Sequence, residues 1–190
     1  GHCLTKDTYH LERGVKVRGS NLDYPEGSES IYVLARKVND FMPRHMFNLT
    51  VSALDRIGKR LEGSNVAMLG WAFINDSDDA RNPPSETYRD LLLEAGAKVT
   101  VHDPHVLSYP EVELFRDIDE VVKGADCIAV MTAHSNYFDL DPAKMKKLTG
   151  QKNPIIIDGR NVVAPDKYID LGFVYKGIGR GDKNRHDIRV

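Results

Sequence analysis

Residues 1–7, Gly-His-Cys-Leu-Thr-Lys-Asp, place a thiol beside groups that can activate it. A cysteine becomes nucleophilic when a nearby cation lowers its pKa, and Lys6 and His2 supply cationic or titratable groups next to Cys3. A neighbouring carboxylate such as that of Asp7 can position or deprotonate water. Alone, the segment is a weak signal, because buried and inert cysteines are common in proteins.

A second candidate segment, residues 70–85, directly follows a short apolar run and contains Phe73, Arg81 and several aspartates. In an open parallel sheet, ligands bind beyond the carboxyl ends of the strands, so this segment is placed to bind one. We expect Ser85 to cap the following helix, whose N-terminus attracts phosphate. The alternative is a solvated acidic loop in which Arg81 only pairs with its neighbours.

The third candidate segment, residues 155–161, is again an apolar run followed by a tight turn. Gly159 permits a backbone conformation that is closed to other residues. Arg160 carries a forked donor that suits phosphate oxygens or pairs of hydroxyl groups. An arginine at a strand end can equally form a surface ion pair, so this segment proves little by itself.

From Asn65 onward, short apolar runs alternate with segments of helical periodicity. The pattern predicts strands over 66–69, 98–102, 127–131 and 155–158, and helices over 85–95, 118–122 and 142–148. Runs that are apolar on both faces indicate a parallel sheet covered on both sides. We therefore expect an α/β, Rossmann-like three-layer domain with a mainly parallel sheet.

Before this domain, the sequence lacks the alternation of apolar runs and helical segments. Residues 1–27 are rich in turn-forming residues, so we expect Cys3 in or beside a loop. Between residues 28 and 59, apolar side chains recur every three or four positions, which predicts a long amphipathic helix or two helices joined near Pro43. Its apolar face needs a partner domain or a second subunit to cover it. Residues 176–190 are expected to end in mobile structure.

The composition limits the classes of function. The 190 residues suit one domain with an appended segment, and a net charge of -2 gives no overall field toward nucleic acid or a membrane. No apolar run approaches the ~20 residues that span a bilayer. The two cysteines are Cys3 and Cys127, and Cys127 lies in a predicted buried strand. These features favour a cytoplasmic protein without disulfides, and we assign no metal site.

In their order and spacing, the three segments resemble the UDP-glucose/GDP-mannose dehydrogenase family, which has a catalytic-cysteine segment, an Ala-Phe-Lys…Asp…Arg segment and an Asp-Gly-Arg segment. The resemblance runs from Gly1 to about Lys176, and the helix containing Asn-Asp-Phe-Met-Pro at 39–43 fits the family's central connecting helix. The branch that it most resembles oxidises UDP-N-acetylhexosamines such as UDP-N-acetylmannosamine.

The resemblance implies an NAD-dependent 6-dehydrogenase that oxidises the C6 alcohol of a nucleotide sugar to a carboxylate with two NAD+. Cys3 matches the nucleophile, which forms a thiohemiacetal with the aldehyde and then a thioester that water hydrolyses. Asp7 matches the aspartate that assists water, and Lys6 lies near the cysteine and cofactor.

The remaining matches concern binding. Arg81 matches an arginine that reaches the cofactor, and Phe73 and Arg160 match residues that line the UDP-sugar pocket. Ile74 departs from the family, which commonly has lysine there, and isoleucine offers neither charge nor hydrogen bond. Either another residue takes this role or the substrate is held differently.

The resemblance also divides the chain. It implies a catalytic-cysteine segment over 1–27, a central helix over 28–60 that pairs with a second subunit in a homodimer, and a UDP-sugar-binding domain over 61–190. No Gly-x-Gly-x-x-Gly turn follows a strand anywhere in these residues. We therefore expect the NAD site to lie mostly on a separate N-terminal domain, and this chain alone not to turn over substrate.

Two other interpretations stay open. The chain could be a non-catalytic nucleotide-binding or dimerisation module in which Cys3 is incidental, or a small Rossmann-like protein of unrelated function. The dehydrogenase interpretation is favoured because Cys3, Asp7, Arg81 and Arg160 all match, and an incidental module has no reason to retain the four together.

Overall fold

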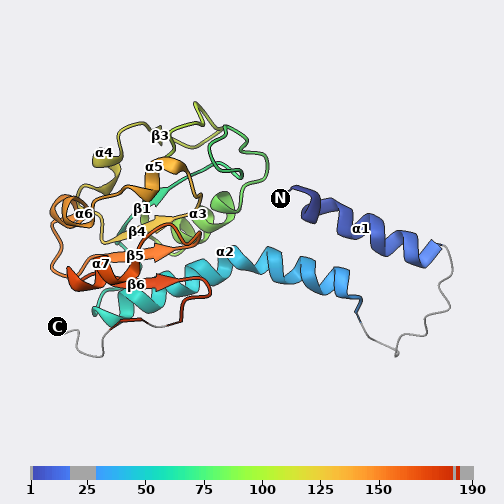
Figure 1. Cartoon of the computed structure of the whole chain (residues 1–190), viewed down its shortest axis with the longest axis horizontal. Helices are drawn as coiled ribbons and strands as arrows, with labels where there is room; N and C mark the ends of the chain where they lie inside the picture. The colour runs from blue at the N-terminus through green and yellow to red at the C-terminus, as the bar shows by residue number, and fades with distance from the viewer. Residues whose placement is uncertain (1, 18–28, 182, 185–190) are drawn as a thin grey trace. The chain divides into compact units, whose positions relative to one another are not determined.

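The structure is a computed structural model that describes the backbone of residues 2–17, 29–181 and 183–184, and their side chains except those of 2–5 and 15–17 (Figure 1). The chain forms two compact units, Gly1–Met42 and Pro43–Val190.

The first unit contains helix α1 (His2–Val17) and the beginning of helix α2 (Ile31–Arg56). Our prediction that Cys3 lies in or beside a loop is wrong, because its backbone belongs to α1. Residues 2–13 contain neither glycine nor proline, so nothing in that stretch interrupts a helix. Most of the turn-forming residues that suggested a loop come later in the segment, from Gly14 onward.

Side-chain contacts join α1 to the start of α2 within this unit. The hydroxyl of Ser30 donates to the Glu12 carboxylate, and the Arg36 guanidinium lies over the Tyr9 ring at 5.9 Å from its centroid. An apolar stripe on α2 remains more than half exposed, and it consists of Ile31, Leu34, Val38 and Phe41. The helix therefore has the uncovered apolar face that the sequence predicts.

Helix α2 is one continuous helix that contains Pro43, so the alternative of two joined helices does not hold. Its C-terminal part belongs to the second unit, where Met46, Ala53 and Leu54 are buried in the core. The Thr50 hydroxyl lies 2.7 Å from the Tyr88 hydroxyl, which fixes this part of α2 against the next helix.

The second unit is built on a parallel sheet with the strand order β3-β2-β1-β4-β5-β6. The strands are β1 (Asn65–Leu69), β2 (Lys98–His102), β3 (Leu114–Phe115), β4 (Cys127–Val130), β5 (Ile155–Asp158) and β6 (Val174–Gly177). The four predicted strands are present to within one residue at each end. Strands β3 and β6 were not predicted, because the first has two residues and the second lies in a tail rich in glycine.

Helices cover both faces of this sheet. Helix α3 (Pro84–Glu94) and the C-terminal part of α2 pack on one face, over strand residues such as Met68 and Ile157. The other face, with Leu69 and Ile156, is covered by α4 (Ile118–Val122), α5 (Ser135–Phe138), α6 (Pro142–Thr149) and α7 (Pro165–Asp170). This arrangement confirms the predicted α/β, Rossmann-like three-layer domain.

The tail begins within the sheet, because Lys176 and Gly177 belong to β6. Asn184 is buried, and its side-chain amide accepts from the Tyr175 N–H at 2.8 Å and donates to the Tyr175 carbonyl at 2.6 Å. Residues 185–190, where we expect the tail to end in mobile structure, lie outside the described residues, as does residue 182.

Cys127 lies buried in β4 as predicted, and burial followed by the nearby Asp126 carboxylate raises the pKa of its thiol. A membrane-spanning helix was not expected, and none of the helices in the described residues is long and apolar enough to be one.

Gly70, at the end of β1, is expected to be essential for stability. Its φ is +94°, and a Cβ there meets the Thr132 side chain at 2.5 Å and the Thr132 nitrogen at 2.8 Å. Gly70→Ala should therefore lower the free energy of unfolding by about 3 kcal/mol, from backbone strain and overpacking together. Denaturation followed by fluorescence of the single tryptophan, the buried Trp71, measures the loss.

Gly124→Ala is the matched control, because Gly124 also has a positive φ of +73° but a Cβ there meets no atom within 4 Å. Only the backbone strain remains, so the loss should be about 1 kcal/mol. Equal losses in the two variants would contradict the role given to the Thr132 contact.

Candidate functional site

The strand order places the topological switch point, beside which open α/β sheets have their binding crevice, between β1 and β4. The connection after β1 runs through α3 on one face of the sheet, and the connection after β4 runs through α5 and α6 on the other. Ligands of open α/β sheets bind where the connections diverge in this way, beyond the carboxyl ends of the strands. The segments after β1, β2, β4 and β5 therefore form the candidate site.

Asp103, directly after β2, joins three of these segments. Its side chain is fully buried, and its Oδ2 accepts from the backbone N–H groups of Trp71 at 2.7 Å and Ala72 at 2.9 Å. The other oxygen, Oδ1, accepts from the backbone N–H groups of His105 and Val106 at 2.8 and 2.9 Å. The carboxylate thus holds the segment after β1 against the segment after β2.

The charge of Asp103 is well stabilised despite its burial. Burial acts to raise the pKa of the carboxyl group, but hydrogen bonds from His134 and from backbone N–H groups outweigh it and hold the pKa well below its usual value. The group is therefore ionised at neutral pH, and a permanent negative charge lies beneath the crevice.

His134, after β4, has a fully buried side chain whose two nitrogens are both engaged. Its Nε2 lies 3.1 Å from Asp103 Oδ2, and its Nδ1 accepts from the backbone N–H of Asp76 at 2.9 Å. Because Asp103 is ionised and accepts, Nε2 carries the proton and Nδ1 carries the lone pair.

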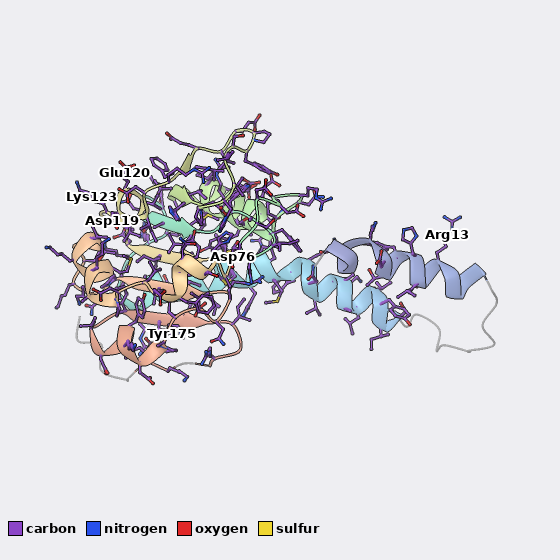
Figure 2. All side chains as sticks on the ribbon, turned by 45° about the horizontal axis from the view of Figure 1, so that its top comes forward. Arg13, Asp76, Asp119, Glu120, Lys123 and Tyr175 are labelled. Atoms are coloured by element: carbon purple, nitrogen blue, oxygen red, sulfur yellow. The ribbon has the colours of Figure 1, made fainter. Side chains whose placement is uncertain are left out.

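Asp76, labelled in Figure 2, lies in the segment after β1 with a φ of +51°. Its carboxylate accepts from the Ser135 hydroxyl at 2.6 Å and the Ser135 N–H at 2.7 Å. These bonds, with smaller contributions from His134 and His105, lower the pKa of Asp76. The His105 ring completes the cluster, and its centroid lies 4.8 Å from that of His134.

The turn after β5, like the turn after β2, has a buried aspartate whose carboxylate accepts from backbone N–H groups of the same turn. Asp158 is buried, and its carboxylate accepts from the backbone N–H groups of Arg160, Val162 and Val163 at 3.0 to 3.1 Å. Gly159 does not have the positive φ that we expected. Its lack of a side chain serves packing instead, because a Cβ there meets the Val130 carbonyl at 2.9 Å.

Two predicted binding residues, Phe73 and Arg160, lie in segments that converge on this edge. Arg160 is exposed, and its Nη2 donates to Asn75 Oδ1 at 3.2 Å. Asn75 also accepts from the backbone N–H of Ala133, so it links the segments after β1, β4 and β5. The half-buried Phe73 donates its backbone N–H to Asp79 at 2.8 Å.

Arg81 lies in the same segment as Phe73, and it forms the local ion pair that was considered as an alternative. Its Nε and Nη2 donate to the two Asp79 carboxylate oxygens at 2.8 and 2.7 Å. The side chain is 77% exposed, so its other N–H groups face solvent. Ser85 is not the predicted cap, because the helix begins after Pro83 and the Ser85 hydroxyl donates to the Trp71 carbonyl.

The other three predicted residues belong to the first unit. Cys3, Lys6 and Asp7 occupy positions i, i+3 and i+4 of α1, which share one face of a helix. Lys6 and Asp7 are exposed, and the side chain of Cys3 lies outside the described residues.

A separate cavity of about 300 Å³ lies between α5, α6 and α7. Its lining includes Tyr137, Asp139, Asp141, Lys167 and Tyr168. The two aspartates make it a poorer site for an anionic ligand than the edge that carries Arg160.

Comparisons with known proteins identify the family. The sequence profile for the UDP binding domain of the UDP-glucose/GDP-mannose dehydrogenase family matches residues 67–165, just over half of the chain. The UDP-N-acetyl-D-mannosamine dehydrogenase of Pyrococcus horikoshii is 31% identical over 182 residues, which cover 96% of this chain and 39% of that protein. The UDP-glucose 6-dehydrogenase of Pseudomonas aeruginosa is 29% identical, with 95% of this chain and 40% of that protein covered.

A solved structure is more similar. The crystal structure of NDP-N-acetyl-D-galactosaminuronic acid dehydrogenase from Methanosarcina mazei Go1 superposes with a TM-score of 0.90 and 67% identity, covering 95% of this chain and 38% of that one. The chain thus spans about two fifths of the length of the relatives that it matches. The chain belongs to the UDP-glucose/GDP-mannose dehydrogenase family, and residues 67–165 match its UDP binding domain.

Proposed function

We propose that this chain is the UDP-sugar-binding part of an NAD-dependent nucleotide-sugar 6-dehydrogenase. The 67% identity to the Methanosarcina mazei enzyme, maintained over 95% of this chain, is the observation that carries the proposal. The relatives' names agree on oxidation of a nucleotide sugar, although the chain covers only part of each of them.

The UDP-sugar binds at the carboxyl edge of the sheet in this proposal. Arg160 is exposed there and offers a planar set of donors to phosphate oxygens. Asn75 accepts from one Arg160 nitrogen and so directs the guanidinium toward the segment that contains Phe73. Ile74 cannot supply the charge of the family's lysine, and Arg160 provides a cation at the same edge.

The sugar is an N-acetylhexosamine in this proposal. Relatives named for N-acetylmannosamine are about 30% identical to this chain, whereas the enzyme named for N-acetylgalactosaminuronic acid is 67% identical. The higher identity favours the galacto configuration, and binding measurements with both UDP-sugars can rank them.

Arg81 is the residue that we assign to the cofactor. Its exposed guanidinium keeps N–H groups available for phosphate while Asp79 fixes its direction, so the arrangement fits a dinucleotide phosphate. When bound, NAD+ would supply the hydride acceptor for each of the two oxidation steps. Most of the cofactor site belongs, in this proposal, to a domain outside these residues.

Cys3 supplies the covalent step. After the C6 alcohol has lost a proton and a hydride, the Cys3 thiolate adds to the aldehyde carbon to give a thiohemiacetal. Loss of a second hydride gives a thioester, and water then displaces the thiol to release the carboxylate. Asp7, one helical turn from Cys3, orients the water, and Lys6 places a positive charge near the cysteine and the cofactor.

The exposed stripe on α2 is the surface that we assign to a homodimer. Its four apolar side chains lie on the central helix, and a second copy of the same helix would remove them from water. The dehydrogenase is expected to act in the cytoplasm.

Arg160→Ala should weaken UDP-sugar binding by about tenfold, which corresponds to ~1.4 kcal/mol, because a charge-assisted hydrogen bond to phosphate is lost. Calorimetry with the 190-residue chain and UDP-N-acetylgalactosamine measures the affinity directly. Arg60→Ala is the matched control, since Arg60 is also exposed but precedes β1 at the opposite edge of the sheet. Equal losses in the two variants would argue against the proposed location.

Cys3→Ser should reduce uronate formation at least about 100-fold in the enzyme that joins this chain to its cofactor domain, because a serine hydroxyl is a far weaker nucleophile. The affinity of the Cys3→Ser enzyme for the UDP-sugar should stay within about twofold of that of the unaltered enzyme. Cys127→Ala serves as the control, since Cys127 is fully buried in β4 and should not be needed for turnover. Full activity of Cys3→Ser would favour the non-catalytic module instead.

The double variant Leu34→Asp/Val38→Asp should be monomeric if the α2 stripe forms the dimer, because each dimer would bury four unpaired carboxylates. Sedimentation velocity measures the oligomeric state of the double variant and of the control variant Leu107→Asp, which changes a side chain that is 83% exposed in the second unit. We expect the Leu107→Asp chain to dimerise and the double variant to be monomeric. A double variant that still dimerises would rule out this face.

A further inference from the structure

We propose that Asp76, His105 and His134 form a binding site for a first-row divalent cation, for which Zn²⁺ is the best fit. The three residues come from the segments after β1, β2 and β4, and they meet at the crevice beyond the sheet. The proposal concerns binding by this chain and does not depend on the dehydrogenase reaction.

The geometry of the three potential ligand atoms carries the inference. His105 Nε2 lies 3.6 Å and His134 Nδ1 lies 3.8 Å from Asp76 Oδ1, and the three atoms are within 4.8 Å of one another. These separations are too long for hydrogen bonds. Tetrahedral zinc with bonds of about 2.0–2.2 Å holds neighbouring ligand atoms roughly 3.4 Å apart, so a small contraction brings the three atoms to bonding distance.

His134 already has the support that metal-binding histidines usually have. A ligating imidazole commonly donates its second N–H to a carboxylate, which fixes its tautomer and orientation. Asp103 is that carboxylate here, at 3.1 Å from His134 Nε2, and both side chains are fully buried. The lone pair of Nδ1 is thereby directed toward Asp76 and cannot rotate away.

His105 supplies a second imidazole nitrogen with no competing role. Its Nε2 atom is buried and makes no hydrogen bond within the part of the chain that the structure describes. The side chain as a whole is 33% exposed, so neighbouring atoms do not enclose it completely. A buried nitrogen without a partner is unfavourable, and a bound cation would satisfy it.

One existing interaction must be exchanged for the metal. His134 Nδ1 accepts the Asp76 backbone N–H at 2.9 Å, and a cation would take that lone pair. Asp76 is exposed, so its freed N–H can bond to water. The exchange is favourable, because a metal–imidazole bond is far stronger than the net contribution of one backbone hydrogen bond.

The choice of cation follows from the donor set. Imidazole nitrogens suit zinc, copper, iron and nickel, whereas magnesium and calcium require oxygen ligands. Two imidazoles and one carboxylate leave a fourth tetrahedral position for water or a ligand oxygen. We assigned no metal site from the sequence, because the three residues are far apart along the chain and only the strand order brings them together.

Zn²⁺ titration of the 190-residue chain by calorimetry at neutral pH tests the proposal. The expected result is saturable binding of one Zn²⁺ per chain, and Co²⁺ should give the intense visible absorption of tetrahedral coordination. His105→Ala and Asp76→Asn should each lower the Zn²⁺ affinity by at least about tenfold. The His105→Ala chain should keep its circular dichroism spectrum, because within the described residues the buried His105 Nε2 makes no hydrogen bond that the substitution would remove.

The controls replace the same residue types outside the cluster. His45→Ala changes a histidine of α2, and Asp78→Asn changes an exposed aspartate two positions after Asp76. Both variants should bind Zn²⁺ as tightly as the unaltered chain. Absence of saturable binding, or His105→Ala binding with unchanged affinity, would overturn the proposal, because any zinc taken up would then be held elsewhere.

Discussion

The buried carboxylate of Asp103 is the group on which the carboxyl edge of the sheet depends. It accepts hydrogen bonds from the segments that follow β1, β2 and β4, so one negative charge fixes three parts of the chain that are distant in sequence. Removing such a charge from water costs several kcal/mol unless hydrogen bonds replace hydration. With five donors around its two oxygens, Asp103 meets this requirement, and the segments are held in place before any ligand arrives.

Asp158, on the other side of the crevice, stabilises the turn that follows β5. Each aspartate ends its strand region and accepts from the backbone N–H two residues later, which gives a local turn stabilised by its own side chain. Arg160 therefore projects from a turn whose backbone is already hydrogen-bonded, and its amide partner Asn75 comes from a second stabilised segment. Such preorganisation reduces the entropy lost when a ligand binds.

The sequence predicted the sheet well, because buried parallel strands are continuous apolar runs that stand out between helical segments. It failed where local patterns were ambiguous. Turn-forming residues later in the first segment suggested a loop at Cys3, although the stretch around it is uninterrupted helix. The sequence predicts Ser85 as a cap, but Pro83 is the N-cap and the helix begins at Pro84.

Some residues of the candidate site could likewise be predicted from the sequence, and others could not. Phe73, Arg81 and Arg160 could be selected because each follows a recognisable strand, and strand ends of a parallel sheet share one edge. His105 and His134 gave no such signal, since Asp76, His105 and His134 lie in three separate segments of the sequence. Their proximity results from β2 and β4 lying on either side of β1, which is a property of strand order and not of local sequence.

The hydrogen bonds between the Asn184 side chain and the Tyr175 backbone bear on whether the sheet can aggregate through its edge. Among the described residues β6 is an outer strand of the sheet, and the outward backbone groups of an outer strand can template hydrogen bonding to another chain. The Asn184 amide occupies both backbone groups of Tyr175, in the middle of that strand, as a neighbouring strand would. The opposite outer strand, β3, is only two residues long. Both edges of the sheet are thereby less able to pair with another chain. The Asn184 side chain takes the place of a neighbouring strand at β6, and β3 is too short to offer a long edge.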